Sequence, residues 1–454
     1  MADFRAYPRL EAFERLHISD GLTITAERWQ QAHNYHRQRQ NFHYQALYEP
    51  GIVYGLGVAP LPDQPDGRLL QIQPGVAIDI QGNPIILKTP EEFRLTSEAS
   101  DGQPIWVYLV VNYVDPDDLR RAPVAKTVQE TFRIVEKLHL DPNDVELCRV
   151  QLLPAAIAIQ ASTDVFAPQP NQLDLRGRPT PQPYRQYVVR VGQINGDRPT
   201  DATTYAGLTD LLRSLAGLYP SLGAAPTVQP FSAKALSRET AIDCHLLYLP
   251  YNTLLTLPNP GLQRLQSYLA TGATVLVAAD FGDTNLLNLL DIGQELHRAL
   301  MEAERDGELE PMTRQLRAEI AANQQAIAQQ LEQLEQSLRA IAAAWGLPLH
   351  ESGDLSLDHP LRSHPFLFSQ PPPRQGHPVY IKNWGGLVFL VGDLSLSWGR
   401  SAMPPISREV LRSAQEWGIN LLHFAAQRQH WVQSMRPLPL APTPTRDSLQ
   451  QRVN

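Results

Sequence analysis

The chain has 454 residues, of which 43% are hydrophobic and 19% charged, and its formal net charge is −8. At about 100–200 residues per domain this length predicts several domains, and the composition is typical of globular rather than disordered chains. The mild acidity disfavours a nucleic-acid binder, and no apolar run reaches the about 18 residues that span a bilayer. The two cysteines, Cys148 and Cys244, exclude a disulfide-rich scaffold or a cysteine zinc cluster and fit a reducing compartment.

Residues 1–60 are predicted to form a segment of a loop, a helix and a turn. Thr25 is the expected N-cap, and Glu27 lies in the first turn, where the helix dipole favours an acid. The helix should end near Tyr48, before Pro50-Gly51. Residues 51–58 then predict a short strand whose glycines allow a bulge or a close backbone approach.

Residues 61–165 are predicted to be a β domain. Apolar residues alternate at 69–73, turn dipeptides follow, and the run 105–114 is apolar throughout, as in a buried strand. Further strands are expected at 76–80, 85–87, 145–153 and 156–160. Short strands divided by turn residues predict a small sandwich or barrel.

The segment 166–186 carries five prolines and predicts an extended, stiff linker between two weakly packed halves. Residues 437–454 form a second proline-rich segment at the end of the chain. That tail predicts either a polyproline-like recognition segment or a disordered end, and both interpretations stay open.

Residues 187–436 alternate predicted strands and helices. The strands are expected at 187–191, 244–249, 273–279 and 386–391, and the helices at 206–218, 260–271 and 407–428. This succession predicts an α/β domain with a mostly parallel sheet.

A helical insertion at 292–345 interrupts this domain. Its second part, 313–345, carries apolar residues mostly three and four apart, and we interpret the insertion as a long antiparallel helical hairpin. Such a stripe must be buried against the main domain or against a partner chain. The residues predicted to contact a partner are Leu316, Ile320, Ile327, Leu331, Leu334 and Leu338.

Histidines suggest two possible metal sites. His33, His36 and His43 fall on one helical stripe, and a spacing of three residues lets two of them share a metal. Packing against aromatic neighbours is favoured instead, because no HExxH pattern accompanies them. His359 and His364 each precede a proline and therefore lie in extended backbone, where a turn is the favoured interpretation.

Candidates for catalysis are few. Asp280 and Asp393 each follow an apolar strand, at the carboxyl ends where α/β proteins place their sites, although capping of the next turn is favoured. Pro250-Tyr251-Asn252 lacks the serine, cysteine or glycine of a nucleophile elbow. We therefore predict no catalytic residue, no cofactor and no metal, with His359, Asp280 and Asp393 as the only weak metal candidates.

Three patterns in the first part of the chain occur in a fixed order. They are Tyr35-His36-Arg37, the glycine-rich segment 51–58, and the pair of predicted strands in 74–82. In this order they resemble proteins encoded among phage-tail and contractile-injection-system genes, over residues 17–95. The resemblance implies a baseplate-associated protein.

The second part, over residues 187–430, resembles an uncharacterised bacterial domain of glutamine-amidotransferase-like, flavodoxin-type fold. The matching landmarks are Cys244 to Leu249, Tyr268 through Ala279-Asp280-Phe281, Leu357 to Leu361, Gly392-Asp393-Leu394 with Trp398, and Trp417 to Asn420. The chain departs from that family at Tyr251-Asn252, where Gly-His is frequent, at Ala279, which replaces an acid, and at the insertion. These departures weaken any inherited site.

The resemblances predict a non-catalytic structural subunit of a contractile injection system or phage-tail-like particle, near the baseplate. Its expected partners are baseplate, sheath or tube subunits, in several copies with three- or six-fold symmetry, without nucleic acid. The expected location is cytoplasmic, within a large assembly that can dock at the inner face of a membrane. The alternatives are a hydrolase-like or carbohydrate-binding protein that uses the α/β cleft, and an adaptor that recruits cargo.

Overall fold

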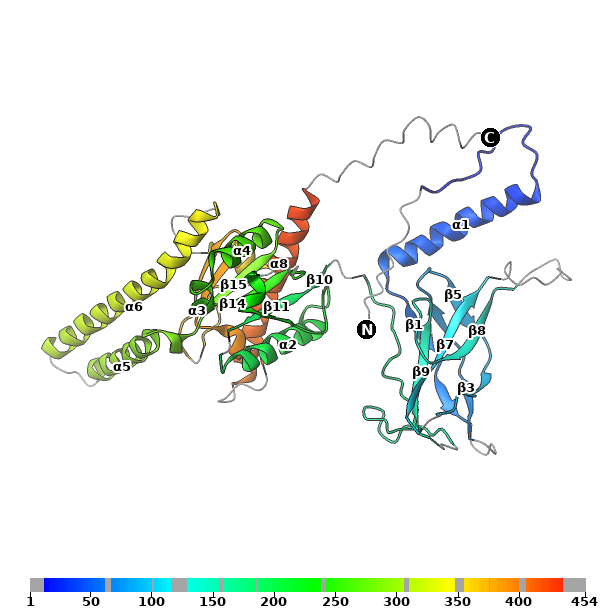
Figure 1. Ribbon diagram of the computed structural model, residues 1–454, viewed down its shortest axis with the longest axis horizontal. Helices are drawn as coiled ribbons and strands as arrows, with labels where there is room; N and C mark the ends of the chain where they lie inside the picture. The colour runs from blue at the N-terminus through cyan, green and yellow to red at the C-terminus, as the bar shows by residue number, and fades with distance from the viewer. Residues whose placement is uncertain are drawn as a thin grey trace. The chain divides into compact units, whose positions relative to one another are not determined.

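We describe a computed structural model of the chain. It describes residues 12–61, 67–99, 102–115, 129–154, 158–184, 187–196, 198–237, 242–305, 310–347, 355–374, 376–399 and 406–435. The chain divides into two units, Met1–Tyr184 and Arg185–Asn454, which we call the β unit and the α/β unit (Figure 1). The proline-rich tail 437–454 lies outside the described residues.

Short antiparallel strands build the β unit, in three sheets of three strands each. One sheet has the order β1-β4-β5, the second β2-β3-β6 and the third β8-β7-β9. The bounds are β1 (Gly51–Gly55), β2 (Val58–Pro60), β3 (Leu69–Ile72), β4 (Gly75–Ile78), β5 (Pro84–Leu87), β6 (Glu91–Arg94), β7 (Ile105–Val114), β8 (Thr131–Lys137) and β9 (Val145–Leu152). All three sheets contribute to one apolar core, and the expected β character of this region is confirmed.

The predicted boundary between the segment 1–60 and the β domain 61–165 is not a boundary in the structure. β1 pairs with β4, and β2 pairs with β3, so residues 51–60 belong to the sheets. The single strand predicted at 51–58 is broken at Leu56, which is buried and has a positive φ of 53°. Strand β7 matches its predicted range, because its inward side chains are apolar along its whole length.

The predicted linker is wrong for most of its length. Residues up to Tyr184 are held on the β unit by backbone hydrogen bonds, which join Arg149 to Asp174 in both directions and Ile52 N to Pro179 O. Leu173 is 5% exposed and belongs to the core of the β unit. Prolines are compatible with this placement because they can lie at a sheet edge, where their missing N–H is not needed for pairing.

Helix α1 (Ala26–Leu47) lies on the β unit with none of its residues fully buried. Thr25 is its N-cap, as predicted, and accepts a hydrogen bond from Arg28 N at 3.3 Å. Its second half carries the contacts: Arg37 forms an ion pair of 2.7 Å with Asp115. Gly82 lies so close to the backbone of Asn41 that a Cβ atom would clash with it.

The α/β unit is built on a six-stranded sheet of order β13-β11-β14-β15-β17-β16. Five strands are parallel and β16 is antiparallel, so the predicted mostly parallel sheet is confirmed. The bounds are β11 (Val191–Asn195), β13 (Gln229–Ser232), β14 (Leu246–Pro250), β15 (Thr274–Ala279), β16 (Tyr380–Trp384) and β17 (Leu387–Val391). A separate parallel pair joins β10 (Tyr187–Val189) to β12 (Leu222–Ala224).

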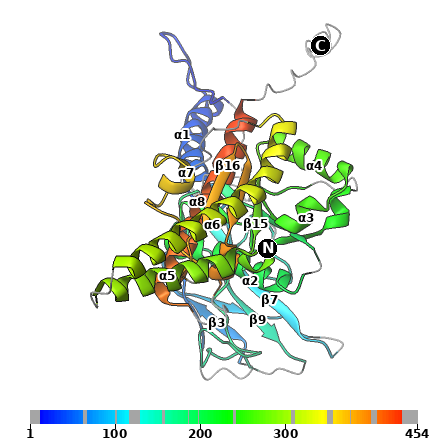
Figure 2. The ribbon, with the colours of Figure 1, turned by 90° about the vertical axis from the view of Figure 1, so that its left-hand side faces the viewer.

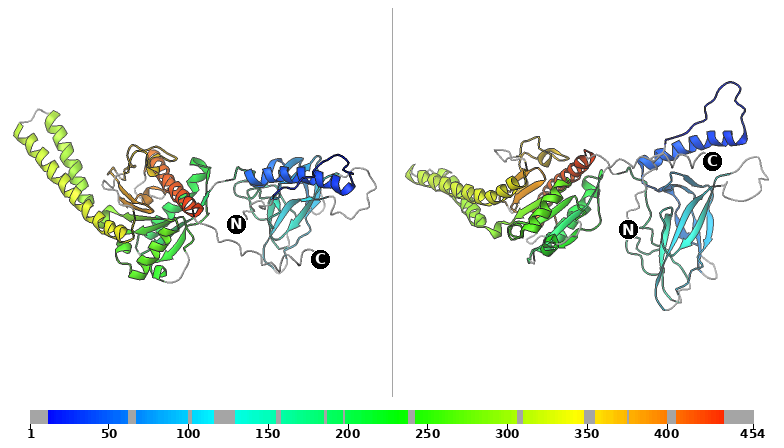
Figure 3. Two further views of the ribbon diagram at one scale, coloured as in Figure 1. Left: turned by 90° about the horizontal axis from the view of Figure 1, so that it is seen from above. Right: turned by 45° about the horizontal axis from the view of Figure 1, so that its top comes forward.

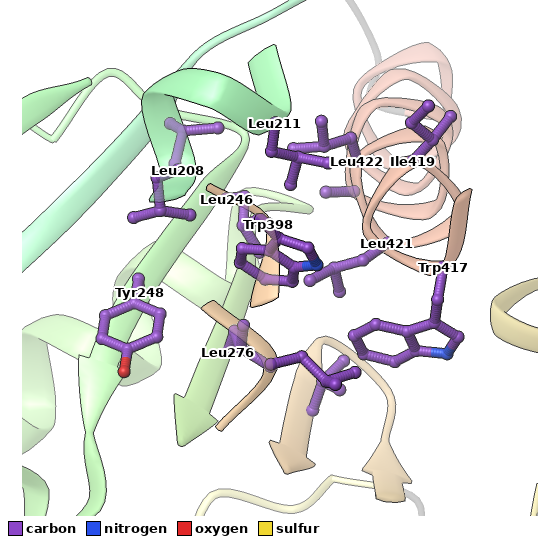
Figure 4. Packing of buried hydrophobic residues seen from close by; sticks show 14 of the residues in the cluster. Leu208, Leu211, Leu246, Tyr248, Leu276, Trp398, Trp417, Ile419, Leu421 and Leu422 are labelled. Atoms are coloured by element: carbon purple, nitrogen blue, oxygen red, sulfur yellow. The ribbon is translucent and has the colours of Figure 1, made fainter. Parts of the chain in front are cut away.

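Helices cover both faces of this sheet because its central strands are apolar on both sides. One face packs against α2 (Asp201–Leu218) and α8 (Arg408–Ser434), and this core includes the fully buried Trp398 and Trp417, of which Trp417 belongs to α8 (Figure 4). The other face packs against α3 (Tyr251–Leu255), α4 (Asn259–Ala270) and the helical insertion. The remaining short elements are α7 (Pro360–Ser363) and the 3-10 turns η2 (Ala233–Ser237), η3 (Phe281–Asp283) and η4 (Leu394–Ser397).

The insertion is a helical hairpin, as predicted, of α5 (Leu286–Arg305) and α6 (Glu310–Ala344). Its two helices run side by side away from the sheet (Figures 2 and 3). Asn323 of α6 donates a hydrogen bond of 2.9 Å to Leu289 O on the facing helix. This polar contact therefore joins the first turn of α5 to the middle of α6, at the base of the paired helices.

The predicted partner-contact residues require a correction. Leu338 is fully buried and Ile320 is 8% exposed, so neither is available to a partner. Ile327, Leu331 and Leu334 are half-buried and pack against the core of the α/β unit. The stripe is thus buried mainly by its own domain, and partner contact stays a prediction for its half-exposed members.

Candidate functional site at the carboxyl edge of the sheet

The carboxyl ends of β11, β14, β15 and β17 meet at one edge of the α/β sheet. Strand β11 lies between β13 and β14 in the sheet. The chain passes from β11 to β13 on one side and then crosses to β14 on the other side, so the order of the strands reverses at β11. Open α/β sheets bind ligands outside such a switch point. A ligand-binding or catalytic site of the α/β unit is therefore expected at this edge.

Asp393 is buried at this edge, with 3% exposure, directly after β17. Its Oδ2 accepts a hydrogen bond of 2.6 Å from the Tyr248 hydroxyl, and its Oδ1 accepts one of 2.9 Å from Ser395 N. Burial, together with the Asp393 charge, raises the pKa of Tyr248. The carboxylate thus caps η4, as the capping interpretation predicts, and it also ties the middle of β14 to the turn after β17.

Asp201 is the first residue of α2 and is buried, with 9% exposure. One carboxylate oxygen, Oδ2, accepts hydrogen bonds from Gly196 N at 2.9 Å and Arg198 N at 3.1 Å. The Arg198 side chain also forms an ion pair with the other carboxylate oxygen, with its Nε 3.3 Å from Asp201 Oδ1. Gln193, fully buried in β11, donates to Asp201 O at 2.9 Å. The carboxylate of Asp201 therefore ties the start of α2 to residues that precede the helix.

The position of a nucleophile elbow, after β14, is filled by an aromatic side chain. Tyr251 is 7% exposed, and its ring lies 5.7 Å from that of Phe389 between centroids. Its hydroxyl donates to Leu334 O on α6 at 3.3 Å. Here the side chain after the strand anchors the helical insertion to the sheet.

Asp280 follows β15 and caps η3 by accepting a hydrogen bond of 2.9 Å from Gly282 N. Its Oδ1 also lies 3.0 Å from Nη1 of Arg374, which is 7% exposed. Nearby, His377 Nε2 lies 3.0 Å from Asp291 Oδ1 at the base of α5. This cluster joins the hairpin base to the segment before β16.

His359 lies in a different place, at the N-terminus of α7. Its Nδ1 accepts a hydrogen bond of 3.2 Å from Leu361 N, and its ring lies 5.8 Å from that of Phe424 on α8. His359, Asp280 and Asp393 each cap a helix or turn, and among the described residues none of the three bonds to another. His364 Nδ1 lies 3.1 Å from the Ser363 hydroxyl.

The three histidines of α1 contact aromatic rings, which is the alternative that the sequence favoured. The His33 ring lies 5.4 Å from that of Trp29, and the His43 ring 6.1 Å from that of Tyr44. Across the described ranges, no group of three or more His, Cys, Asp or Glu side chains could hold a metal ion. Within the same ranges no helix is long and apolar enough to cross a membrane.

Cys244 and Cys148 are both buried, and burial raises the pKa of each thiol to about 12. Cys244 lies before β14, at the amino end of the strand, and its Sγ lies 3.4 Å from Gln229 Oε1. A thiol with so high a pKa stays protonated and is a poor nucleophile. Both cysteines therefore act as small apolar core residues.

His245 makes the stability of the α/β unit depend on pH. Its Nδ1 accepts a hydrogen bond of 3.0 Å from Arg190 N, and burial, assisted by the Arg190 charge, lowers its pKa from 6.5 to about 4. His245 takes up a proton near pH 6.5 in the unfolded chain and only near pH 4 in the folded chain. Stability that is present above pH 6.5 is therefore lost as the pH falls toward 4, by up to about 3 kcal/mol at 1.4 kcal/mol per pKa unit.

We expect His245→Asn, which keeps an acceptor for Arg190 N, to lose less stability than the wild type between pH 7 and pH 4.5. Urea unfolding followed by tryptophan fluorescence at both pH values measures the difference. His423, whose pKa burial also lowers, titrates in both proteins and cancels in the comparison. An unchanged pH slope in the variant would contradict the assignment to His245.

The sequence did not identify the residues that join Asp393 at this edge. Tyr248 lies in an apolar run and looks like a core residue, and only its hydroxyl distinguishes it. Asp201 could have been found, because an acid in the first turn of a helix that follows a strand is a recognisable signal of a helix start. Gln193 gave no signal, since a polar residue inside a parallel strand has no motif of its own.

No family model and no curated protein matches the chain. Among solved structures, the crystal structure of TssK matches with 12% identity over 45% of this chain and 48% of that chain, at a TM-score of 0.19. The match thus spans about half of the TssK chain, and a TM-score this low does not establish a shared fold.

Proposed function

We propose that this chain is a non-catalytic structural subunit of a contractile injection system or phage-tail-like particle, placed near the baseplate and acting through protein–protein contacts. The observation that carries the non-catalytic part is the carboxyl edge of the α/β sheet. There Tyr251 and Asp393, which follow β14 and β17, bond to the chain itself, and so does Asp201 at the start of α2. An α/β enzyme holds its ligand and nucleophile at such strand ends.

An exposed apolar row on the β unit supports the binding role. Tyr54 is paired with Val76, and Val76 with Ile86, so the three side chains lie beside one another on one face of the sheet β1-β4-β5. Tyr54 is 65% exposed and Ile86 51% exposed. We call Tyr54, Val76 and Ile86 the apolar row. Contiguous exposed apolar side chains are a feature of interaction surfaces.

The particle assignment is supported by the resemblance of residues 17–95, whose motifs have structural roles here. Asp79 accepts hydrogen bonds from Gln81 N and Asn83 N and so shapes the turn between β4 and β5. Gly82, at that turn, leaves room for Asn41 of α1. The motif residues therefore hold α1 against the sheet that carries the apolar row.

We expect the double substitution Tyr54→Ser with Ile86→Ser to leave the fold intact, because both side chains are more than half exposed. It should reduce incorporation of the chain into its assembly by about tenfold or more, since losing two anchors costs at least about 1.4 kcal/mol of binding free energy. Sedimentation of particles from cells that express the variant measures incorporation.

Phe166→Ser is the matched control, because Phe166 is 83% exposed and lies outside the apolar row. It should assemble like the wild type. Equal incorporation of the double variant and the control would show that the apolar row does not bind a partner in the assembly.

A further inference from the structure

The β unit ends in a strap, residues 171–184, that runs along the outer edges of β9 and β1 (Figure 1). Its pairings include isolated bridges of Arg149 with Asp174 and of Tyr48 with Pro183. The strap ends at Tyr184, and the α/β unit begins at the next residue. The attachment of the strap therefore decides how much chain joins the docked parts of the two units.

The inner strap, residues 171–176, is anchored in the β unit. Leu173 and Asp174 are each 5% exposed, and Leu173 belongs to the core. Asp174 exchanges two backbone hydrogen bonds with Arg149. Arg176 then grips the Asp174 carboxylate, because its Nε and Nη2 each donate a hydrogen bond of 2.9 Å. A buried leucine and a two-way backbone bond should open only when the β unit unfolds.

The outer strap, residues 177–184, is attached in a different way, since none of its residues is buried. Arg178 Nη2 donates a hydrogen bond of 2.6 Å to Gly55 O. Prolines at alternate positions have no N–H to donate. Three backbone hydrogen bonds of 2.8 Å join the outer strap to residues 47–52: Ile52 N to Pro179 O, Glu49 N to Gln182 O, and Tyr184 N to Leu47 O.

These contacts favour a local opening of the outer strap. A backbone hydrogen bond contributes little net stability when water can replace it, and no buried side chain adds to the hold here. The detached segment also regains conformational entropy. Segments with few buried contacts and exposed hydrogen bonds open at a lower free energy than the core. The outer strap should therefore open while the sheets stay folded.

We propose that the outer strap detaches reversibly from the β unit while the inner strap stays docked. The chain that joins the docked parts of the two units then grows from residues 185–186 to residues 177–186. At up to about 3.6 Å per residue, the eight added residues give at most about 29 Å of further reach. The strap is thus a switch between a short tether and a long one. This inference does not rest on the proposed function.

Native-state hydrogen exchange on the full chain, read at single amides in low concentrations of urea, tests the opening. The Ile52, Glu49 and Tyr184 amides should exchange about tenfold or more faster than those of Arg149 and Asp174. Urea should barely change their exchange, because a local opening exposes little surface. Exchange of both groups with the same steep urea dependence would overturn the proposal, since the outer strap would then open only with the whole unit.

Gly51 offers a way to weaken the docking, because the outer strap passes directly over it. A Cβ atom there would lie 2.7 Å from Thr180 C, too close for any real contact. Gly51→Ala should therefore speed exchange at Ile52, Glu49 and Tyr184 about tenfold or more. Exchange at Arg149 and Asp174 should not change.

Gly217→Ala is the matched control, because a Cβ atom on Gly217 meets nothing within 4 Å. It should leave exchange in the strap unchanged. Arg178→Ala keeps the test valid if Gly51→Ala disturbs β1 itself, because it removes the bond to Gly55 O without touching that strand. It should speed exchange in the outer strap several-fold. Folded Arg178→Ala protein with unchanged exchange would overturn the proposal.

Optical tweezers test the change in length. Handles are attached through Lys88→Cys and Gln266→Cys, at one exposed residue of each unit, while the native Cys148 and Cys244 are buried. The full chain should lengthen in a reversible step of at most about 29 Å before either unit unfolds. Gly51→Ala should lower the force of that step. A chain that shows no step before the unfolding of a unit would overturn the proposal.

Discussion

Leu338→Ala should lower the free energy of unfolding of the α/β unit by about 2–5 kcal/mol, the usual cost of removing a fully buried leucine side chain. Leu338 lies near the C-terminal end of α6 and has no exposed surface. It belongs to the same core cluster as Leu286 of α5 and Phe389 of β17. Chemical denaturation followed by tryptophan fluorescence measures the loss.

Leu316→Ala is the control on the same helix. Leu316 is only half-buried and lies nearer the tip of the hairpin, so its truncation should cost about 1 kcal/mol or less. A small loss for both variants would show that α6 does not belong to the core. In that case the stripe would be free for a partner, as the sequence first suggested.

Asp393→Ala should destabilise the α/β unit by about 3 kcal/mol or more. It removes the acceptor of the Tyr248 hydroxyl and of Ser395 N, and each buried donor left without a partner costs about 1–3 kcal/mol. Gly207 of α2 packs closely on the Ser395 carbonyl, so a shift of η4 is transmitted to that helix. Differential scanning calorimetry of the full chain should show a lower Tm for the α/β transition.

Asp393→Asn keeps one acceptor oxygen. It should therefore lose less than half of the stability that Asp393→Ala loses. The same variants separate the structural from the catalytic interpretation. We expect the wild type to show no turnover with generic ester, amide and glycoside substrates. Turnover by the wild type that vanishes in the folded Asp393→Asn protein would favour the alternative, a hydrolase that works through the α/β cleft.

The repeating parts of the fold could be predicted because their signals are local. Strands β7, β14 and β15 are continuous apolar runs, and α6 carries its stripe over many turns. Strand β6 was missed because Glu91 and Glu92 give it no apolar alternation. The linker was misassigned because proline content predicts an extended backbone, whereas packing against Arg149 and Ile52 depends on distant residues.

The candidate site was predictable only in part. Asp280 and Asp393 were correctly placed at strand ends and as caps, because a strand followed by an acid is a local pattern. The bond from Tyr248 to Asp393 joins residues 145 positions apart, which no spacing in the sequence reveals. The partner-contact stripe could not be resolved, because periodicity shows that a helix face must be buried and does not show what buries it.

The most direct test of the structural-subunit proposal is crosslinking of particles isolated from the source organism. Lys88 follows β5, beside the apolar row, and is exposed. The proposal predicts that the chain sediments with a large particle and that an amine-reactive reagent joins Lys88 to other proteins of that particle. A chain that stays in the slowly sedimenting fraction, with crosslinks only within itself, would contradict it.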